Sequence, residues 1–146
     1  MIEGNPGRRA LNPREAKPEL ELPSPPPFLN ADAKEEWVRV SAELYGLGLL
    51  TGIDRGPLAA YCQAYGRWTQ AERAILEMQK NGKLGAGLMI MTSNGNAIQN
   101  PLVGTANKAM RDMIHCAAEF GMTPSARSRV DAGHKPAAGK FDGLLG

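Results

Sequence analysis

The chain has 146 residues and a formal net charge of +2, and its length fits one compact domain with extensions at its ends. This small charge excludes a uniformly basic nucleic-acid-binding protein, so contacts with nucleic acid require a local patch of cations or many copies of the chain. No apolar run approaches the roughly 18 residues of a membrane span, and no signal-peptide pattern opens the chain, so we expect no membrane partner.

Residues 1–29 hold most of the prolines and show no helical period of apolar residues. This composition predicts an extended, proline-rich arm, either unfolded or lying along the surface of the folded part. Phe28 and Leu29, at the end of the arm, are expected to tuck into the fold. Carboxylates balance the cations of the arm, and these cations are Arg8, Arg9, Arg14 and Lys17.

A first helix is predicted over about residues 31–47, because Asn30 is a good N-cap and apolar residues recur at helical spacing. Two glycines, Gly46 and Gly48, end it. Its apolar stripe consists of Ala33, Trp37, Val40, Leu44 and Leu47.

The segment 54–80 predicts a long central helix of roughly seven turns, around which the rest of the chain is arranged. Thr51 supplies its N-cap, and Asp54, three residues later, resembles a capping box. One side of this helix carries a broad apolar stripe, which includes Trp68. We expect Trp68 and Trp37 to be buried in one cluster.

The other side of the central helix is rich in alanine and glycine. Small residues let a second backbone approach closely, so this helix is predicted to pack on two sides. We predict a subunit interface on this side, and a solvated alanine-rich face is the alternative. The predicted interface residues are Ala60, Ala64, Arg67 and Ala74.

The remaining segments are shorter. A β-hairpin is predicted near residues 87–99, with a turn at 93–96, and it should lean on the helices or on a neighbouring subunit. A third helix begins at Asn100-Pro101 and ends at Gly121. A short helix follows from 123–124 to about 130, and residues 131–146 are predicted to be a flexible tail.

No catalytic, metal or cofactor site is predicted. His115 and His134 are isolated surface histidines, and Cys62 and Cys116 are expected to be buried, reduced thiols. The run GKLGAG at 82–87 lacks the G-K-[ST] ending of a phosphate-binding loop. The two predicted helices meet at residues 46–52, and a DNA-reading helix-turn-helix is the alternative interpretation of this junction. The residues at 54–57 are poorly suited to reading base edges.

Several stretches together carry a resemblance to a known family. They are GNPGRRALN, KPELELPSPPPFLNADAKEEW, LGLLTGIDRGPLAAYCQAYGRW, NPLVGTANKAM and EFGMTPSARSRV. As an ordered set, from Gly4 to about Val130, they resemble the P27 family of phage terminase small subunits. The resemblance implies a mostly helical protein that forms a ring and works in packaging a viral genome in the cytoplasm of the infected bacterial host. It also implies two further partners, viral double-stranded DNA and a separate large subunit that carries the ATPase and nuclease.

We therefore predict a mainly α fold with three principal helices, a small β-hairpin, an arm at 1–29, a helical oligomerisation core at 30–130 and a tail at 131–146. The expected function is that of a non-enzymatic ring that engages viral DNA and recruits or regulates the large subunit. A protein-only oligomeric adaptor of the packaging motor is the alternative. The predicted DNA contacts are the four cations of the arm, with Arg127 and Arg129 as a second basic patch or, alternatively, as caps of a helix dipole.

Overall fold

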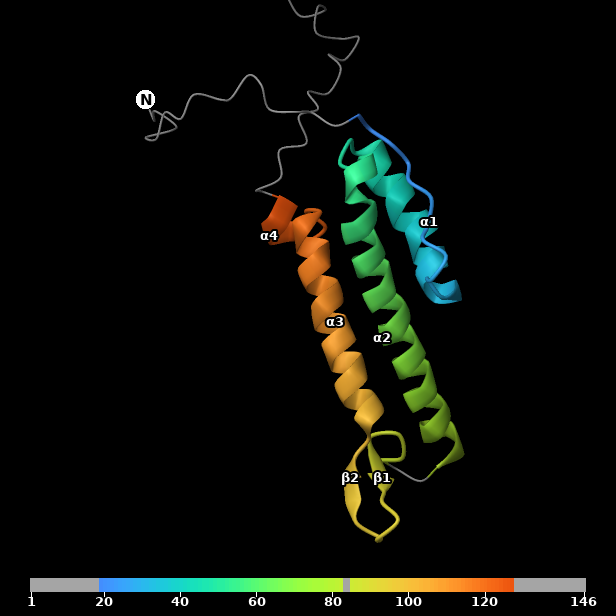
Figure 1. Ribbon diagram of the computed structural model, residues 1–146. Coiled ribbons are helices and arrows are strands. Elements are labelled where there is room, and N and C mark those ends of the chain that lie inside the picture. Colours follow the sequence, from blue (N-terminus) through green and yellow to red (C-terminus); the bar gives the residue numbers. More distant parts are fainter. Residues whose placement is uncertain (1–18, 83–84, 128–146) are drawn as a thin grey trace, which may run out of the picture.

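Three long helices lie side by side in the computed structural model, which describes residues 19–82 and 85–127 (Figure 1). The elements are α1 (Ala31–Gly46), a 3-10 turn (Gly52–Asp54), α2 (Arg55–Asn81), β1 (Met89–Met91), β2 (Ala97–Gln99), α3 (Pro101–Glu119) and α4 (Pro124–Arg127). Helix α2 lies between α1 and α3, and the hairpin extends the far end of the α2–α3 pair. The mainly helical fold with one long central helix and one hairpin is confirmed.

Helix α2, with 27 residues, begins where the sequence predicts. The Asp54 carboxylate accepts hydrogen bonds from the Thr51 backbone N–H at 2.8 Å and from the Thr51 hydroxyl at 2.7 Å. A carboxylate at this position also suits the positive end of the helix dipole. Local chemistry therefore sets the corner between α1 and α2.

Two asparagines start the other long helices. The Asn30 side chain accepts a hydrogen bond from the Ala33 N–H at 2.9 Å and caps α1. Asn100 caps α3 by accepting from the Leu102 N–H at 3.0 Å, and its amide donates to the Gly87 carbonyl at 2.7 Å. Because Asn100 is buried, this one side chain joins the start of α3 to the loop that leads into the hairpin.

The described part of the arm lies along the helical core. Leu20 forms an isolated antiparallel bridge with Thr51, and the Glu21 N–H donates to the Leu50 carbonyl at 3.3 Å. The Trp37 indole N–H donates to the Pro23 carbonyl at 3.2 Å. Proline lacks an N–H but keeps its carbonyl, so a proline-rich strand can still accept hydrogen bonds from the fold. Of the two expectations for the arm, residues 19–29 follow the one in which it lies along a surface.

Buried side chains form two clusters rather than one. The first, at the corner between α1 and α2, includes the fully buried Trp37, Leu50, Leu58 and Cys62. The second lies between α2 and α3 and is built on Ala71, Ile75 and Ala106, with Trp68 packed against it.

Two expectations about individual aromatic residues are therefore wrong. Trp68 is only partly buried and belongs to the second cluster, because it packs toward α3, whereas Trp37 packs against the arm. Phe28 is 67% exposed, although its neighbour Leu29 is buried as expected. Residues 27–28 form a turn, in which the Leu29 N–H donates to the Pro26 carbonyl at 3.3 Å, and this turn leaves Phe28 outside while Leu29 enters the core.

Close packing of α1 on α2 depends on Gly66. A Cβ atom added at Gly66 would lie 2.5 Å from the Asn30 side-chain oxygen and 2.9 Å from the Ala33 Cβ. Both distances are shorter than a side chain tolerates without movement, so α1 reaches its place only because this position has no side chain. The same contact would disturb the cap of α1.

A buried carboxylate links the same two helices. Glu36 is 5% exposed and accepts a hydrogen bond from the Tyr61 hydroxyl at 2.7 Å. The Arg39 guanidinium donates to both oxygens of Glu36, at 2.6 and 2.9 Å. Burial, together with the contact to Glu36, raises the pKa of Tyr61 above its ordinary value, so this hydroxyl stays protonated and keeps donating.

We expect Gly66→Ala to lower the free energy of unfolding by about 1–3 kcal/mol, because overpacking costs more than the better helix propensity of alanine restores. Gly104→Ala in α3 is the matched control. Its new Cβ would meet nothing within 4 Å, so a gain of about 0.5–1 kcal/mol is expected. Urea unfolding followed by circular dichroism, at one fixed protein concentration, measures both values. Equal stabilisation by the two substitutions would contradict the close approach at Gly66.

Tyr61→Phe should cost about 1–3 kcal/mol, because it removes a donor from the buried Glu36 carboxylate. Tyr65→Phe serves as the control, since the Tyr65 hydroxyl forms no hydrogen bond within residues 19–82 and 85–127, and it should change stability by less than about 0.5 kcal/mol. The same urea measurement compares them. A loss no larger for Tyr61 than for Tyr65 would show that the Glu36 contact does not contribute to stability.

Candidate functional site

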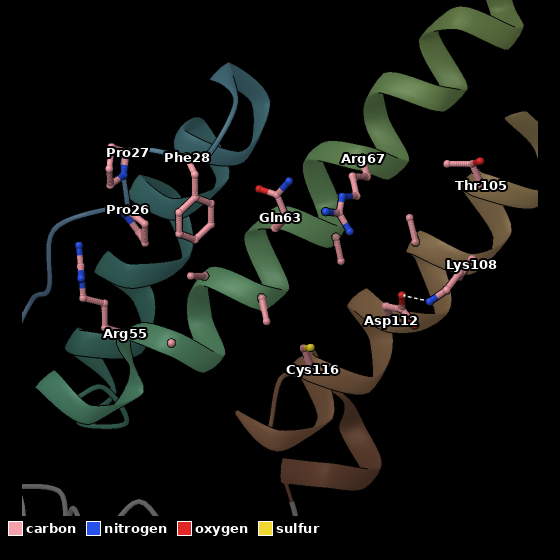
Figure 2. Close-up of a pocket in the computed structure, with 15 residues that line it drawn as sticks. Pro26, Pro27, Phe28, Arg55, Gln63, Arg67, Thr105, Lys108, Asp112 and Cys116 are labelled. Atoms are coloured by element: carbon pink, nitrogen blue, oxygen red, sulfur yellow. Dashed lines mark hydrogen bonds and ion pairs between the residues drawn. The ribbon is translucent and has the colours of Figure 1, made fainter.

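A groove of about 830 Å³ runs along one face of α2 and α3, and the end of the arm forms its third wall (Figure 2). We call it the Arg67 groove. It is lined by Pro26, Pro27, Phe28, Arg55, Gly56, Ala59, Ala60, Gln63, Ala64, Arg67, Thr105, Lys108, Ala109, Asp112 and Cys116.

Three of the four predicted interface residues line this groove. Ala60 and Arg67 are exposed, and Ala64 lies at the floor with 7% exposure. Ala74 lies on the same side of α2, about two turns beyond Arg67, but outside the groove. The structure thus brings most of the predicted surface together, and its role as an interface stays a prediction.

Two other small residues of α2 pack against neighbouring helices of the same chain. Gly66 contacts α1, and Ala71 packs in the cluster with Ala106 of α3. Helix α2 does pack on two sides, as predicted, and both neighbours within the described residues belong to the same chain. The sides of α2 that these two neighbours leave open, one of which holds the Arg67 groove, are left for a partner.

The lining of the Arg67 groove is positively charged. It holds three cations, Arg55, Arg67 and Lys108, and one carboxylate, Asp112, for a formal charge of +2. Lys108 pairs with Asp112 at 2.8 Å, as drawn in Figure 2. This hydrogen bond, with smaller contributions from Arg111 and Arg67, lowers the pKa of Asp112 below its ordinary value. Asp112 therefore stays ionised, and the net positive charge of the groove holds across the neutral range.

The cations of the groove differ in what already binds them. The Arg55 guanidinium donates to the Ser24 carbonyl at 2.9 Å, which fixes the arm against the start of α2. Arg67 forms no ion pair with the described part of the chain. Beside it, the Gln63 side-chain oxygen is buried without a hydrogen-bond partner among the described residues. Arg55 and Arg67 therefore both keep an unpaired charge, and Arg67 is the one whose guanidinium is not also held by the arm.

Most of the predicted DNA contacts fall outside the described residues. This holds for Arg8, Arg9, Arg14, Lys17 and Arg129. Arg127 is exposed at the end of α4 and lines a separate hollow between α1 and α3, next to Arg39. The structure therefore places one member of the second basic patch on the surface.

A charge-free surface at the hairpin end was not predicted. No Asp, Glu, Lys or Arg occurs from residue 84 to residue 107, and apolar side chains of the hairpin are exposed. Leu88 is 50% exposed, Met89 48%, Met91 67% and Ile98 42%. The length of the charge-free run is the signal in the sequence that points to this surface. It lacks the cations that phosphate contacts require, and exposed apolar patches of this kind suit protein partners.

Other chemistry is limited in the described residues. No group of three or more His, Cys, Asp or Glu within residues 19–82 and 85–127 is placed to hold a metal ion, and no helix there is long and apolar enough to cross a membrane. Burial raises the pKa of the Cys62 thiol to about 12, so this thiol is protonated and unreactive at neutral pH. His115 is exposed on α3.

Comparison with known proteins gives a match at the level of the family. The family described as phage terminase, small subunit, matches residues 33–137, which is well over half of the chain. The match begins at the third residue of α1 and includes α2, α3 and α4 in full. The match does not specify the P27 branch. No curated protein and no solved structure matches the chain.

Proposed function

Because the chain belongs to the family of phage terminase small subunits, we propose that it is a non-catalytic, ring-forming component of the machinery that packages phage DNA. In this proposal it engages viral double-stranded DNA and recruits or regulates the large subunit that carries the ATPase and nuclease. Its site of action is the cytoplasm of the infected bacterial host. Membership of the family supports the role in DNA packaging.

The observation that carries the proposal of self-assembly is the Arg67 groove. Ala60 and Ala64 line it with side chains so small that a second backbone can approach closely, and Arg67 offers an unpaired charge at its edge. The groove is open to solvent between two helices that are otherwise packed. Repetition of one such contact around a symmetry axis generates a ring.

Engagement of DNA is proposed to be electrostatic. The four cations of the arm, repeated in every copy, would sum to a basic surface that a single chain of charge +2 does not present. Phosphate contacts of this kind position DNA without reading its sequence. Arg127 and Arg129 form the second candidate patch.

The protein-only adaptor is the second candidate function. The charge-free hairpin end favours it, because an uncharged surface with exposed methionines and leucines suits a protein partner and not a phosphate backbone. In that case the chain would assemble and bind the large subunit without holding DNA tightly itself.

Self-assembly is tested by Ala60→Arg. We expect the wild-type chain to run as a multiple of its mass in native mass spectrometry and light scattering, and Ala60→Arg to run as a single chain, because it adds bulk and a like charge to a groove of charge +2. Ala42→Arg is the matched control, since Ala42 is an exposed alanine of α1 that does not line this groove. The helical circular-dichroism signal should be the same for all three. A wild-type mass for Ala60→Arg would contradict a role of this groove in assembly.

DNA engagement is tested by replacing Arg8 and Arg9 with alanine. We expect weaker binding to phage DNA at low salt, with the slope of log K against log salt reduced by roughly one unit for each lost phosphate contact. The paired variant Arg127→Ala/Arg129→Ala tests the second patch in the same titration. If only the second variant changes the slope, the arm is not the DNA-binding element. If the wild-type chain binds the large subunit but gives no salt-sensitive binding to DNA, the adaptor is the function.

A further inference from the structure

The α2–α3 pair has a second open face on the side opposite the Arg67 groove. A hollow of about 610 Å³ lies there, and Leu76, Trp68, Glu72, Leu88 and Val103 are among the residues that line it. On α2, Arg67 and Leu76 are nine residues apart, which is about two and a half turns, so they point in opposite directions. On α3 the same spacing separates Val103 from Asp112. We call this second surface the Leu76 face.

The two faces differ in the size of their side chains. The Arg67 groove is floored by Ala59, Ala60 and Ala64, whereas the Leu76 face carries bulky apolar groups. Leu76 is 49% exposed and Leu88 is 50% exposed, so both project from the surface. Two helical layers pack closely when large apolar side chains of one surface fit over small side chains of the other.

The two faces also differ in charge. A hollow between α1 and α2 adjoins the Leu76 face through Tyr65, Thr69 and Arg73, and its lining includes the carboxylate of Glu35. Arg73 is already paired with Asp32 at 2.9 Å. Within the described residues, Glu35 and Glu72 form no ion pair, although Glu72 accepts a hydrogen bond from the Trp68 indole N–H.

The unpaired charges of this side, Glu35 and Glu72, are therefore negative, and those of the opposite side, Arg55 and Arg67, are positive. Exposed charges of opposite sign on two surfaces of one molecule favour head-to-tail contact between copies and disfavour contact between two like faces.

We propose that the Leu76 face of one copy is seated in the Arg67 groove of the next copy, so that the interface is head-to-tail. The inference rests on the self-assembly proposed above and adds the identity of the two surfaces that meet. Leu76 and Leu88 fill the space above the alanines, and Arg67 meets the carboxylates around Glu72. A row of copies joined head-to-tail has one unused face at each end, and contact between these two faces closes the row into a ring.

A mixing experiment tests this pairing. Ala60→Arg blocks the Arg67 groove and leaves the Leu76 face intact, whereas Leu76→Arg does the reverse. Each variant alone is expected to be monomeric in native mass spectrometry. An equimolar mixture is expected to form a species of twice the mass of one chain and nothing larger, because only one intact groove and one intact face remain to meet.

Controls keep the outcomes distinct. Ala42→Arg should assemble like the wild-type chain, and circular dichroism should give all variants the wild-type helical signal. If Leu76→Arg is not folded, Glu72→Arg, at an exposed position of the same face, replaces it.

Two results would overturn the pairing while self-assembly stands. One is a Leu76-face variant that assembles like the wild-type chain, and the other is a mixture that stays monomeric. A wild-type chain that is monomeric at every concentration would instead remove the self-assembly on which the inference rests.

Discussion

Two neighbouring helices cannot cover every side of one long helix, and the uncovered sides of α2 determine where this protein has open surfaces. Helix α2 is packed by α1 on one side and by α3 on the other (Figure 1). Gly66 allows α1 to pack closely on α2, and the cluster of Ala71 and Ala106 packs α3 on α2. Neither neighbour can cover the remaining sides of α2. The Arg67 groove and the Leu76 face lie on those sides, so both follow directly from the way α2 is packed.

Polar groups fix the geometry that apolar packing alone would leave loose. Asn30 and Asn100 cap their helices, the Thr51–Asp54 contact sets the first corner, and Glu36 joins α1 to α2 through Tyr61. Each of these contacts is directional, and an unpaired buried carboxylate or amide would be costly. The relative positions of the helices, and with them the shapes of the two open faces, are therefore held by a few hydrogen bonds as well as by the core.

The hairpin end, the Arg67 groove and the Leu76 face differ in charge, and therefore in the kind of partner that each could bind. The hairpin end has no charged residue from 84 to 107, the Arg67 groove carries a net positive charge, and the carboxylates near Glu72 lie on the opposite side. A protein partner is proposed for the first surface, and contacts between copies are proposed for the other two. The cations proposed to contact DNA belong mainly to residues 1–17 of the sequence, so the two proposals assign assembly and DNA engagement to different parts of the chain.

The sequence by itself determined the elements and their ends, because helix caps, the hairpin turn and the spacing of apolar residues act over a few positions of the chain. It also pointed to Ala60, Ala64 and Arg67 as one face, since helical spacing places them together. It could not supply the α3 wall of the groove with Lys108 and Asp112, or the wall from the arm, because these come from segments about 30–50 residues away. Only the tertiary structure decided that Trp68 lies apart from Trp37, that Phe28 is exposed and that Glu36 is buried. The period of a helix says which residues share a side, but the neighbour that covers this side is chosen by packing between distant segments.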